Sequence, residues 1–123
     1  MPDKPIRQID EIYTLAKAME AACQAATNMA MSAGASSHQV QQAVQEAQQV
    51  AGECYQGLAP AGSPLGEAQR NLVGRRELCR SISRLALEHG VDHKLLTDQL
   101  VQVTETAAGL YHASTLSDLG FAA

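Results

Sequence analysis

Apolar residues recur every three or four positions along most of this chain, which is the spacing of one face of an α-helix. In the first such segment they are Ile9, Ile12, Ala16, Met19, Cys23, Ala26 and Ala30. Gly34 can end a helix in a left-handed conformation, and Ser36 or Ser37 can cap the next one. The pattern therefore predicts a helix over 6–33 and a second helix over 36–58.

Small residues form the apolar face of the second predicted helix. They are Val40, Ala43, Ala47, Val50, Cys54 and Gly57. Small side chains allow two helix axes to approach toward the close end of the usual range. We therefore expect the first two helices to pack against each other as a helical hairpin.

Two prolines and a glycine interrupt the pattern over 59–64, so a loop is expected before a third helix over 64–89. Within that helix, Gly74 costs about 1 kcal/mol relative to alanine and indicates a kink or a close contact. Asp92 is a favourable N-cap for a fourth helix over 92–114. The third and fourth helices then form a second hairpin.

Two hairpins joined by a short loop predict an all-α fold, a four-helix up-down bundle in a single domain over 1–123. A chain of 123 residues fits one domain, and the low aromatic content, with no Trp and one Phe, favours helices over a sheet. The C-terminal tail over 115–123 is expected to pack on the bundle or to dock on another chain.

Charge and cysteine content restrict the cellular context. The net charge is −4, so nucleic-acid binding would require a local basic patch. Three cysteines, Cys23, Cys54 and Cys79, without CxxC spacing suit reduced, buried thiols in a cytoplasm. The start of the sequence lacks an apolar signal core and no later stretch is apolar enough for a membrane span, so a cytoplasmic protein without membrane contact is expected.

A cluster of arginines stands out in this acidic chain: Arg70, Arg75, Arg76, Arg80 and Arg84. Arg76, Arg80 and Arg84 are four residues apart and share one helix face, where like charges cost about 0.2–0.5 kcal/mol per pair. An anionic group should offset the repulsion between these arginines. The planar guanidinium group forms paired hydrogen bonds with carboxylates and phosphates. We therefore hypothesise a non-enzymatic interaction module that binds an acidic protein partner or a phosphate-bearing ligand through this arginine face.

Internal pairing of the arginines with carboxylates of the same bundle is the alternative explanation. The candidate carboxylates are Glu20, Glu46, Glu53 and Glu105. Self-association is also expected, because the first two helices bury mainly small side chains and the second helix presents an uncharged glutamine-rich face that is inexpensive to desolvate. This face consists of Gln39, Gln41, Gln42, Gln45, Gln48, Gln49 and Gln56.

Other functional classes find less support in the sequence. The segment 85–100 partly resembles a helix-turn-helix core around Gly90, but Lys94 is the only firm positive charge of its second helix, so a small DNA-binding regulator ranks second. A soft-metal or thiol-based protein, using the three cysteines, is a more distant alternative. No nucleophile stands beside a base at a recognisable spacing, so no catalytic residue, metal site or cofactor is expected.

Overall fold

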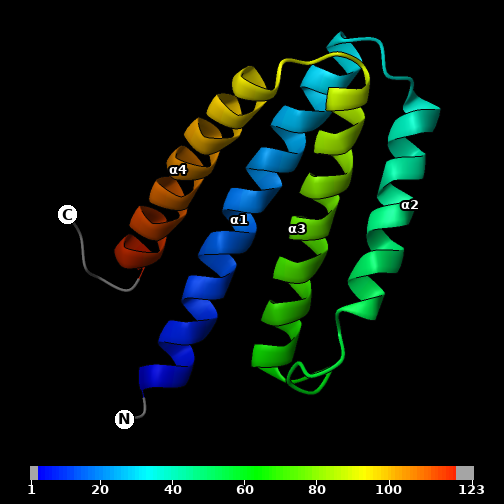
Figure 1. Ribbon diagram of the computed structural model, residues 1–123. Helices are drawn as coiled ribbons and strands as arrows, with labels where there is room; N and C mark the ends of the chain where they lie inside the picture. Colours follow the sequence, from blue (N-terminus) through cyan, green and yellow to red (C-terminus); the bar gives the residue numbers. More distant parts are fainter. Residues whose placement is uncertain (1–2, 119–123) are drawn as a thin grey trace.

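The computed structural model describes residues 3–118, and the side chains of residues 8–108. This part of the chain forms four α-helices and contains no strand, which confirms the all-α prediction (Figure 1). The helices are α1 (Asp3–Ser32), α2 (Ser37–Glu53), α3 (Pro64–Glu88) and α4 (His93–Asp118). None of these described helices is long and apolar enough to cross a membrane.

Local capping residues set most of the helix boundaries where the sequence predicts them. The Ser36 hydroxyl accepts from the Gln39 amide at 3.1 Å, and the Gln39 side chain accepts from the Ser36 amide at 2.9 Å, which is a capping box. Ser63 caps α3 by accepting from the Gly66 amide at 3.0 Å, and Asp92 caps α4 by accepting from the Leu95 amide at 3.0 Å.

Two predicted helix ends are wrong. The second helix ends at Glu53 rather than at 58, because turns follow and Gly57 adopts a left-handed φ of 83° that cannot continue a helix. The fourth helix continues to Asp118 instead of ending near 114, so the predicted tail begins inside α4. Residues 119–123 of that tail lie outside the described residues.

The helices lie side by side in the order α4, α1, α3, α2, with α1 and α3 in the middle (Figure 1). The chain runs the same way along α1 and α3 and the opposite way along α2 and α4. The pairs that pack are α1 with α3, α1 with α4 and α2 with α3. The predicted pairing of α1 with α2 and of α3 with α4 in two hairpins is therefore not confirmed, although the four helices pack as a bundle.

Alanine dominates the contacts between these helices. Nearly inaccessible alanines occur on three helices, namely Ala16, Ala22, Ala26 and Ala30 of α1, Ala43, Ala47 and Ala51 of α2, and Ala68 and Ala86 of α3. The larger core residues Ile82, Leu85 and Leu96 gather where α3 and α4 meet the end of α1. Alanine buries little apolar area per residue, so this core is thin compared with one built of leucine.

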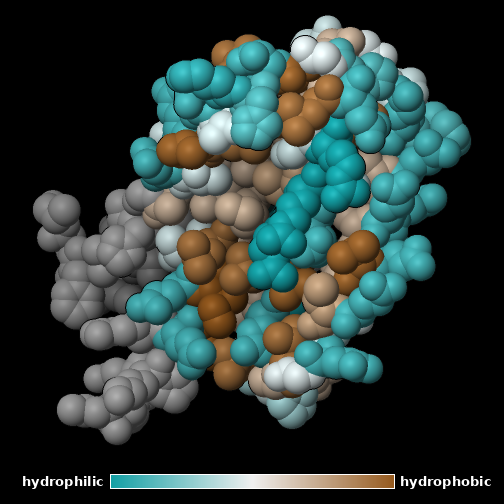
Figure 2. All heavy atoms as spheres, viewed as in Figure 1, coloured by the Kyte–Doolittle hydropathy of each residue, from teal (hydrophilic) through white to brown (hydrophobic). Residues whose placement is uncertain are grey.

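Several large apolar side chains remain exposed on the described surface. They are Leu15, Met31, Val50, Leu87, Leu95 and Val101. Figure 2 shows apolar groups on both sides of a strongly hydrophilic band that follows α3. The same side of the molecule therefore presents charge and apolar surface next to each other.

Gly66, and not Gly74, is the glycine of α3 that makes a close contact. A Cβ atom on Gly66 would overlap the carbonyl oxygen of Pro60, whereas one on Gly74 would meet no atom within 4 Å. The expectation of a close contact at Gly74 is therefore wrong. The chain packs the 59–60 segment directly over the first turn of α3, which the hydrophobic pattern could not indicate.

Candidate functional site

Arg70 is engaged within the chain. Its Nη1 donates hydrogen bonds to the carbonyl oxygens of Ala59 at 2.8 Å and Gly66 at 3.1 Å. Its guanidinium carbon lies 5.4 Å from the centre of the Tyr55 ring, a distance typical of a cation–π contact. Arg70 thus fastens the loop between α2 and α3 to the start of α3.

Arg75 joins α3 to α1. Its Nη1 lies 3.5 Å from Oε1 of Glu20, and its Nε donates to the side-chain oxygen of Asn71 at 3.3 Å. Nζ of Lys17 also lies 3.2 Å from Oε2 of Glu20. The internal pairing that we considered as an alternative therefore occurs for Arg75, as a part-exposed ion pair of the kind that contributes about 1 kcal/mol or less.

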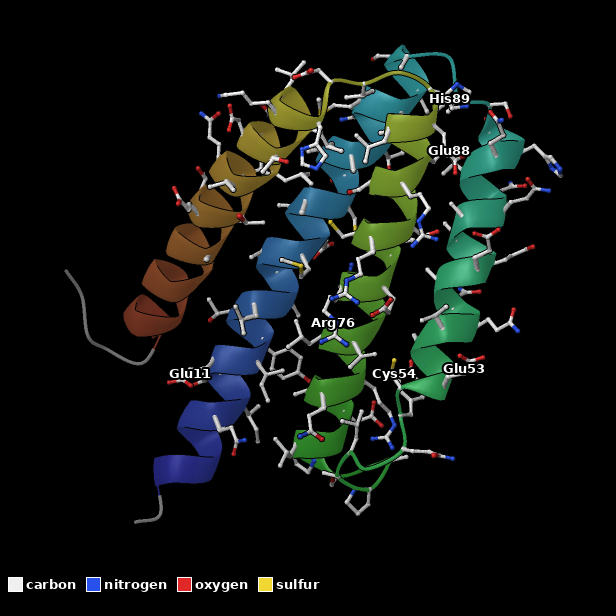
Figure 3. All side chains as sticks on the ribbon, viewed as in Figure 1. Glu11, Glu53, Cys54, Arg76, Glu88 and His89 are labelled. Atoms are coloured by element: carbon white, nitrogen blue, oxygen red, sulfur yellow. The ribbon has the colours of Figure 1, made fainter. Side chains whose placement is uncertain are left out.

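Arg76 and Arg80 share one oxygen of a single carboxylate. Nε of Arg76 lies 3.4 Å and Nη1 of Arg80 lies 3.2 Å from Oε1 of Glu77. The Glu77 side chain is only 8% exposed, whereas that of Arg80 is 65% exposed. A buried carboxylate is costly without cationic partners, so the two arginines stabilise Glu77 while their outer surfaces face solvent. Figure 3 shows Arg76 on the front of α3, the helix that lies between α1 and α2.

Arg84 continues the same helix face one turn further. It is exposed, and within the described residues it makes no ion pair. We refer to Arg76, Arg80 and Arg84 together as the arginine ridge. The ridge has three guanidinium groups, and Glu77 is the carboxylate that pairs with two of them. The hydrophilic band in Figure 2 follows the same helix, α3.

A groove between α2 and α3 runs beside the ridge. One hollow of about 250 Å³ is lined by Glu46, Ala47, Gln49 and Val50 of α2 and by Glu77, Arg80, Ser81 and Arg84 of α3. An adjoining hollow of about 150 Å³ shares Glu46, Ser81 and Arg84 and adds Gln39, Gln42 and Glu88. Between them, the Ser81 hydroxyl donates to the Ala43 carbonyl oxygen at 2.7 Å and ties the two helices together.

The groove brings together two features that the sequence shows only separately. Glutamines of the glutamine-rich face, including Gln42 and Gln49, line the same hollows as Arg80 and Arg84. The groove also contains carboxylates, because Glu46 and Glu88 line it near Arg84. It is therefore a surface of mixed charge with uncharged amides, and sequence reasoning did not identify Glu77 or Ser81 as parts of it.

The segment 85–100 comprises the end of α3, a short turn at Gly90 and the beginning of α4. Most of α4 packs along α1, and only its beginning, at Leu96, packs against Leu85 and Ala86 at the end of α3. Lys94, the cation expected to face DNA, lies 2.9 Å from Oδ2 of Asp98. In the part of the chain that the structure describes, no three His, Cys, Asp or Glu side chains are grouped to hold a metal ion.

No protein-family model matches this chain, and comparisons with curated proteins and with solved structures give no match either.

Proposed function

We propose that this protein is a non-enzymatic interaction module that binds an acidic segment of a protein partner along the groove between α2 and α3. In this proposal, Arg80 and Arg84 pair with carboxylates of the partner, and Arg76 extends the contact along α3. Arg70 and Arg75 hold the fold and do not contact the partner.

The observation that carries the proposal is that Arg80 and Arg84 of the arginine ridge line the same groove as glutamines of the glutamine-rich face. Guanidinium groups form charge-assisted hydrogen bonds with carboxylates, and glutamine amides can both donate to and accept from a peptide backbone. Val50, which is 42% exposed, adds an apolar contact at the same place. A polypeptide offers a matching group for each of these: carboxylates for the guanidinium groups, backbone amides and carbonyls for the glutamines, and apolar side chains for Val50.

A small free phosphate is a poorer match than a polypeptide. Glu46 and Glu88 lie near Arg84 and would repel a compact dianion held there. A peptide can place a carboxylate on Arg84 while its backbone and neutral side chains face the glutamines. A phosphate-bearing ligand is the alternative, because its phosphate oxygens could occupy the place of the peptide carboxylate on Arg84.

Fluorescence anisotropy with a labelled glutamate-rich peptide tests the proposal. We expect Arg84→Gln to weaken binding about tenfold, because a charge-assisted hydrogen bond of about 1.5 kcal/mol is lost. Lys94→Gln removes the same charge from an exposed residue of α4 and serves as the matched control, with unchanged affinity expected. Equal losses for both variants, or no peptide binding at low salt, would refute a specific groove.

The same two variants separate the alternatives. Pyrophosphate that competes with the peptide and depends on Arg84 would favour a phosphate-bearing ligand. Duplex DNA binding with steep salt dependence that is lost in Lys94→Gln, but not in Arg84→Gln, would favour the DNA-binding regulator.

Self-association is part of the proposal, because the alanine core buries little area while large apolar side chains stay exposed. Leu15 on α1 is 52% exposed and Leu95 on α4 is 58% exposed. A second copy of the chain that covers such residues would add apolar burial that the single chain lacks.

A further inference from the structure

Two of the three cysteines, Cys23 and Cys79, belong to α1 and α3, the two helices that pack against each other. Cys23 of α1 is buried, and its Sγ donates a hydrogen bond to the carbonyl oxygen of Arg75 at 3.3 Å. In an α-helix that carbonyl also accepts from the amide four residues later, which here belongs to Cys79. The Cys23 thiol therefore lies against the helical turn that carries Cys79.

Cys79 occupies a half-buried place beside polar groups. Its Sγ lies 3.9 Å from the hydroxyl oxygen of Ser83, one turn further along α3. Both cysteines are reduced, and Cys54 lies apart from them, just past the end of α2 (Figure 3). The chain thus offers one thiol pair and one separate thiol for comparison.

The two thiols of the pair differ in acidity. The neighbouring Cys23 side chain is the main cause that lowers the pKa of Cys79, the Ser83 hydroxyl acts in the same direction and burial opposes both, so that the pKa falls from 9.0 to about 7. The neighbouring Cys79 side chain and burial both raise the pKa of Cys23, with Arg75 opposing and Glu20 reinforcing these effects. Near neutral pH, Cys79 is therefore the nucleophilic partner and Cys23 keeps its proton.

We propose that Cys79 and Cys23 form an oxidation site for hydroperoxides, at which a disulfide bond links α1 to α3. The Cys79 thiolate attacks the terminal oxygen of the hydroperoxide and the O–O bond breaks, so that Cys79 becomes a sulfenic acid and an alkoxide, or hydroxide in the case of hydrogen peroxide, leaves. The Cys23 sulfur then attacks the Cys79 sulfur. Its proton leaves with the sulfenic hydroxyl as water, and the peroxide has taken two electrons from the two thiols.

The packing around the pair suits this cross-link. A disulfide requires Cα atoms about 4.4–6.8 Å apart, closer than the axes of most packed helices. Ala22 and Ala26 flank Cys23 on the buried face of α1 and are almost inaccessible, which allows a close approach of α3. A reaction between copies through this pair is disfavoured, because Cys23 is only 7% exposed.

The test uses the full chain with Cys54→Ser, so that only the pair can react. We expect one equivalent of hydrogen peroxide to remove both alkylatable thiols together and to give one cross-linked peptide containing residues 23 and 79. Cys79→Ser should abolish the rapid reaction, and Cys23→Ser should stop at a sulfenic acid that dimedone traps. Peroxide that leaves both thiols alkylatable in the folded protein would overturn the proposal.

A second measurement needs no substitution within the pair. In the folded Cys54→Ser chain, we expect iodoacetamide to alkylate Cys79 with a rate that rises through a midpoint near pH 7, while Cys23 stays unreactive. Equal alkylation of both thiols, or a midpoint at the value of the unfolded chain, would show that the pair is not an activated dithiol.

Discussion

Alanine substitutions at two glycines of the same helix should have opposite effects on stability. Gly66 and Gly74 both lie within α3, where an exposed glycine usually costs about 0.5–1 kcal/mol relative to alanine. A Cβ on Gly74 meets nothing within 4 Å, so Gly74→Ala should raise the free energy of unfolding by about that amount. A Cβ on Gly66 overlaps the Pro60 carbonyl oxygen and comes within 2.8 Å of the Ala59 carbonyl oxygen.

The cost of Gly66→Ala follows from what holds the 59–60 segment in place. Besides the backbone hydrogen bond from the Ser63 amide to the Pro60 oxygen, three hydrogen bonds that involve side chains do so: Ser63 Oγ to the Pro60 oxygen at 2.6 Å, Arg70 to the Ala59 oxygen at 2.8 Å, and the Ala59 amide to Gln69 at 2.8 Å. At about 1 kcal/mol each, their loss costs about 3 kcal/mol. The helix-propensity gain of about 1 kcal/mol offsets part of this, which leaves a net destabilisation of about 2 kcal/mol.

Urea unfolding followed by circular dichroism measures both variants against the parent chain. The two midpoints should move in opposite directions while the slope m stays unchanged, because the area exposed on unfolding is the same. If Gly66→Ala stabilises the protein as much as Gly74→Ala, the close packing of the loop on α3 is refuted. A matching loss in both variants would instead refute the open space beside Gly74.

Three further outcomes are expected. Arg80→Glu should lower the free energy of unfolding by about 1–3 kcal/mol, because it places a second carboxylate beside buried Glu77. Arg84→Glu should change the free energy of unfolding by less than about 0.5 kcal/mol, and thermal melts of both variants check this. Since the pKa of Cys79 is lowered from 9.0 to about 7 on folding, its thiolate contributes stability that is absent well below pH 7 and grows as the pH rises from about 7 toward 9. Denaturant unfolding across this window should lose that rise in Cys79→Ser. Leu95→Gln should reduce self-association in sedimentation velocity over a wide concentration range without loss of helicity, and a parent chain that is monomeric at every concentration would contradict the proposed self-association.

The helices could be predicted from the sequence because their signals are local. Ser36, Ser63 and Asp92 cap helices within three residues of themselves, and a glycine such as Gly34 ends a helix by its own left-handed φ. The partners of each helix could not be predicted in this way. The alanine faces of α1, α2 and α3 are chemically alike, so nothing in the face of α2 distinguishes α3 from α1 as its neighbour.

The candidate site was predictable in part for the same reason. The shared face of Arg76, Arg80 and Arg84 follows from helical spacing alone, and the structure keeps these residues on the surface of α3. Arg70 is not part of this surface because it bonds the loop that folds back over α3, and Arg75 is not part of it because it pairs with Glu20 of α1, the helix that packs on α3. Both are consequences of tertiary packing that no local pattern contains.

The central position of α1 and α3 also affects how the chain folds. These two helices are each other's main partners, yet the whole of α2 and its loops separate them in the sequence. The first helix must therefore close a long loop before it gains its principal contacts, and folding rates fall as such sequence separation grows. During synthesis, the alanine face of α1 stays without a partner until α3 has emerged. A bundle of equal length in which the first helix packed on the second would complete its first contacts sooner and refold faster.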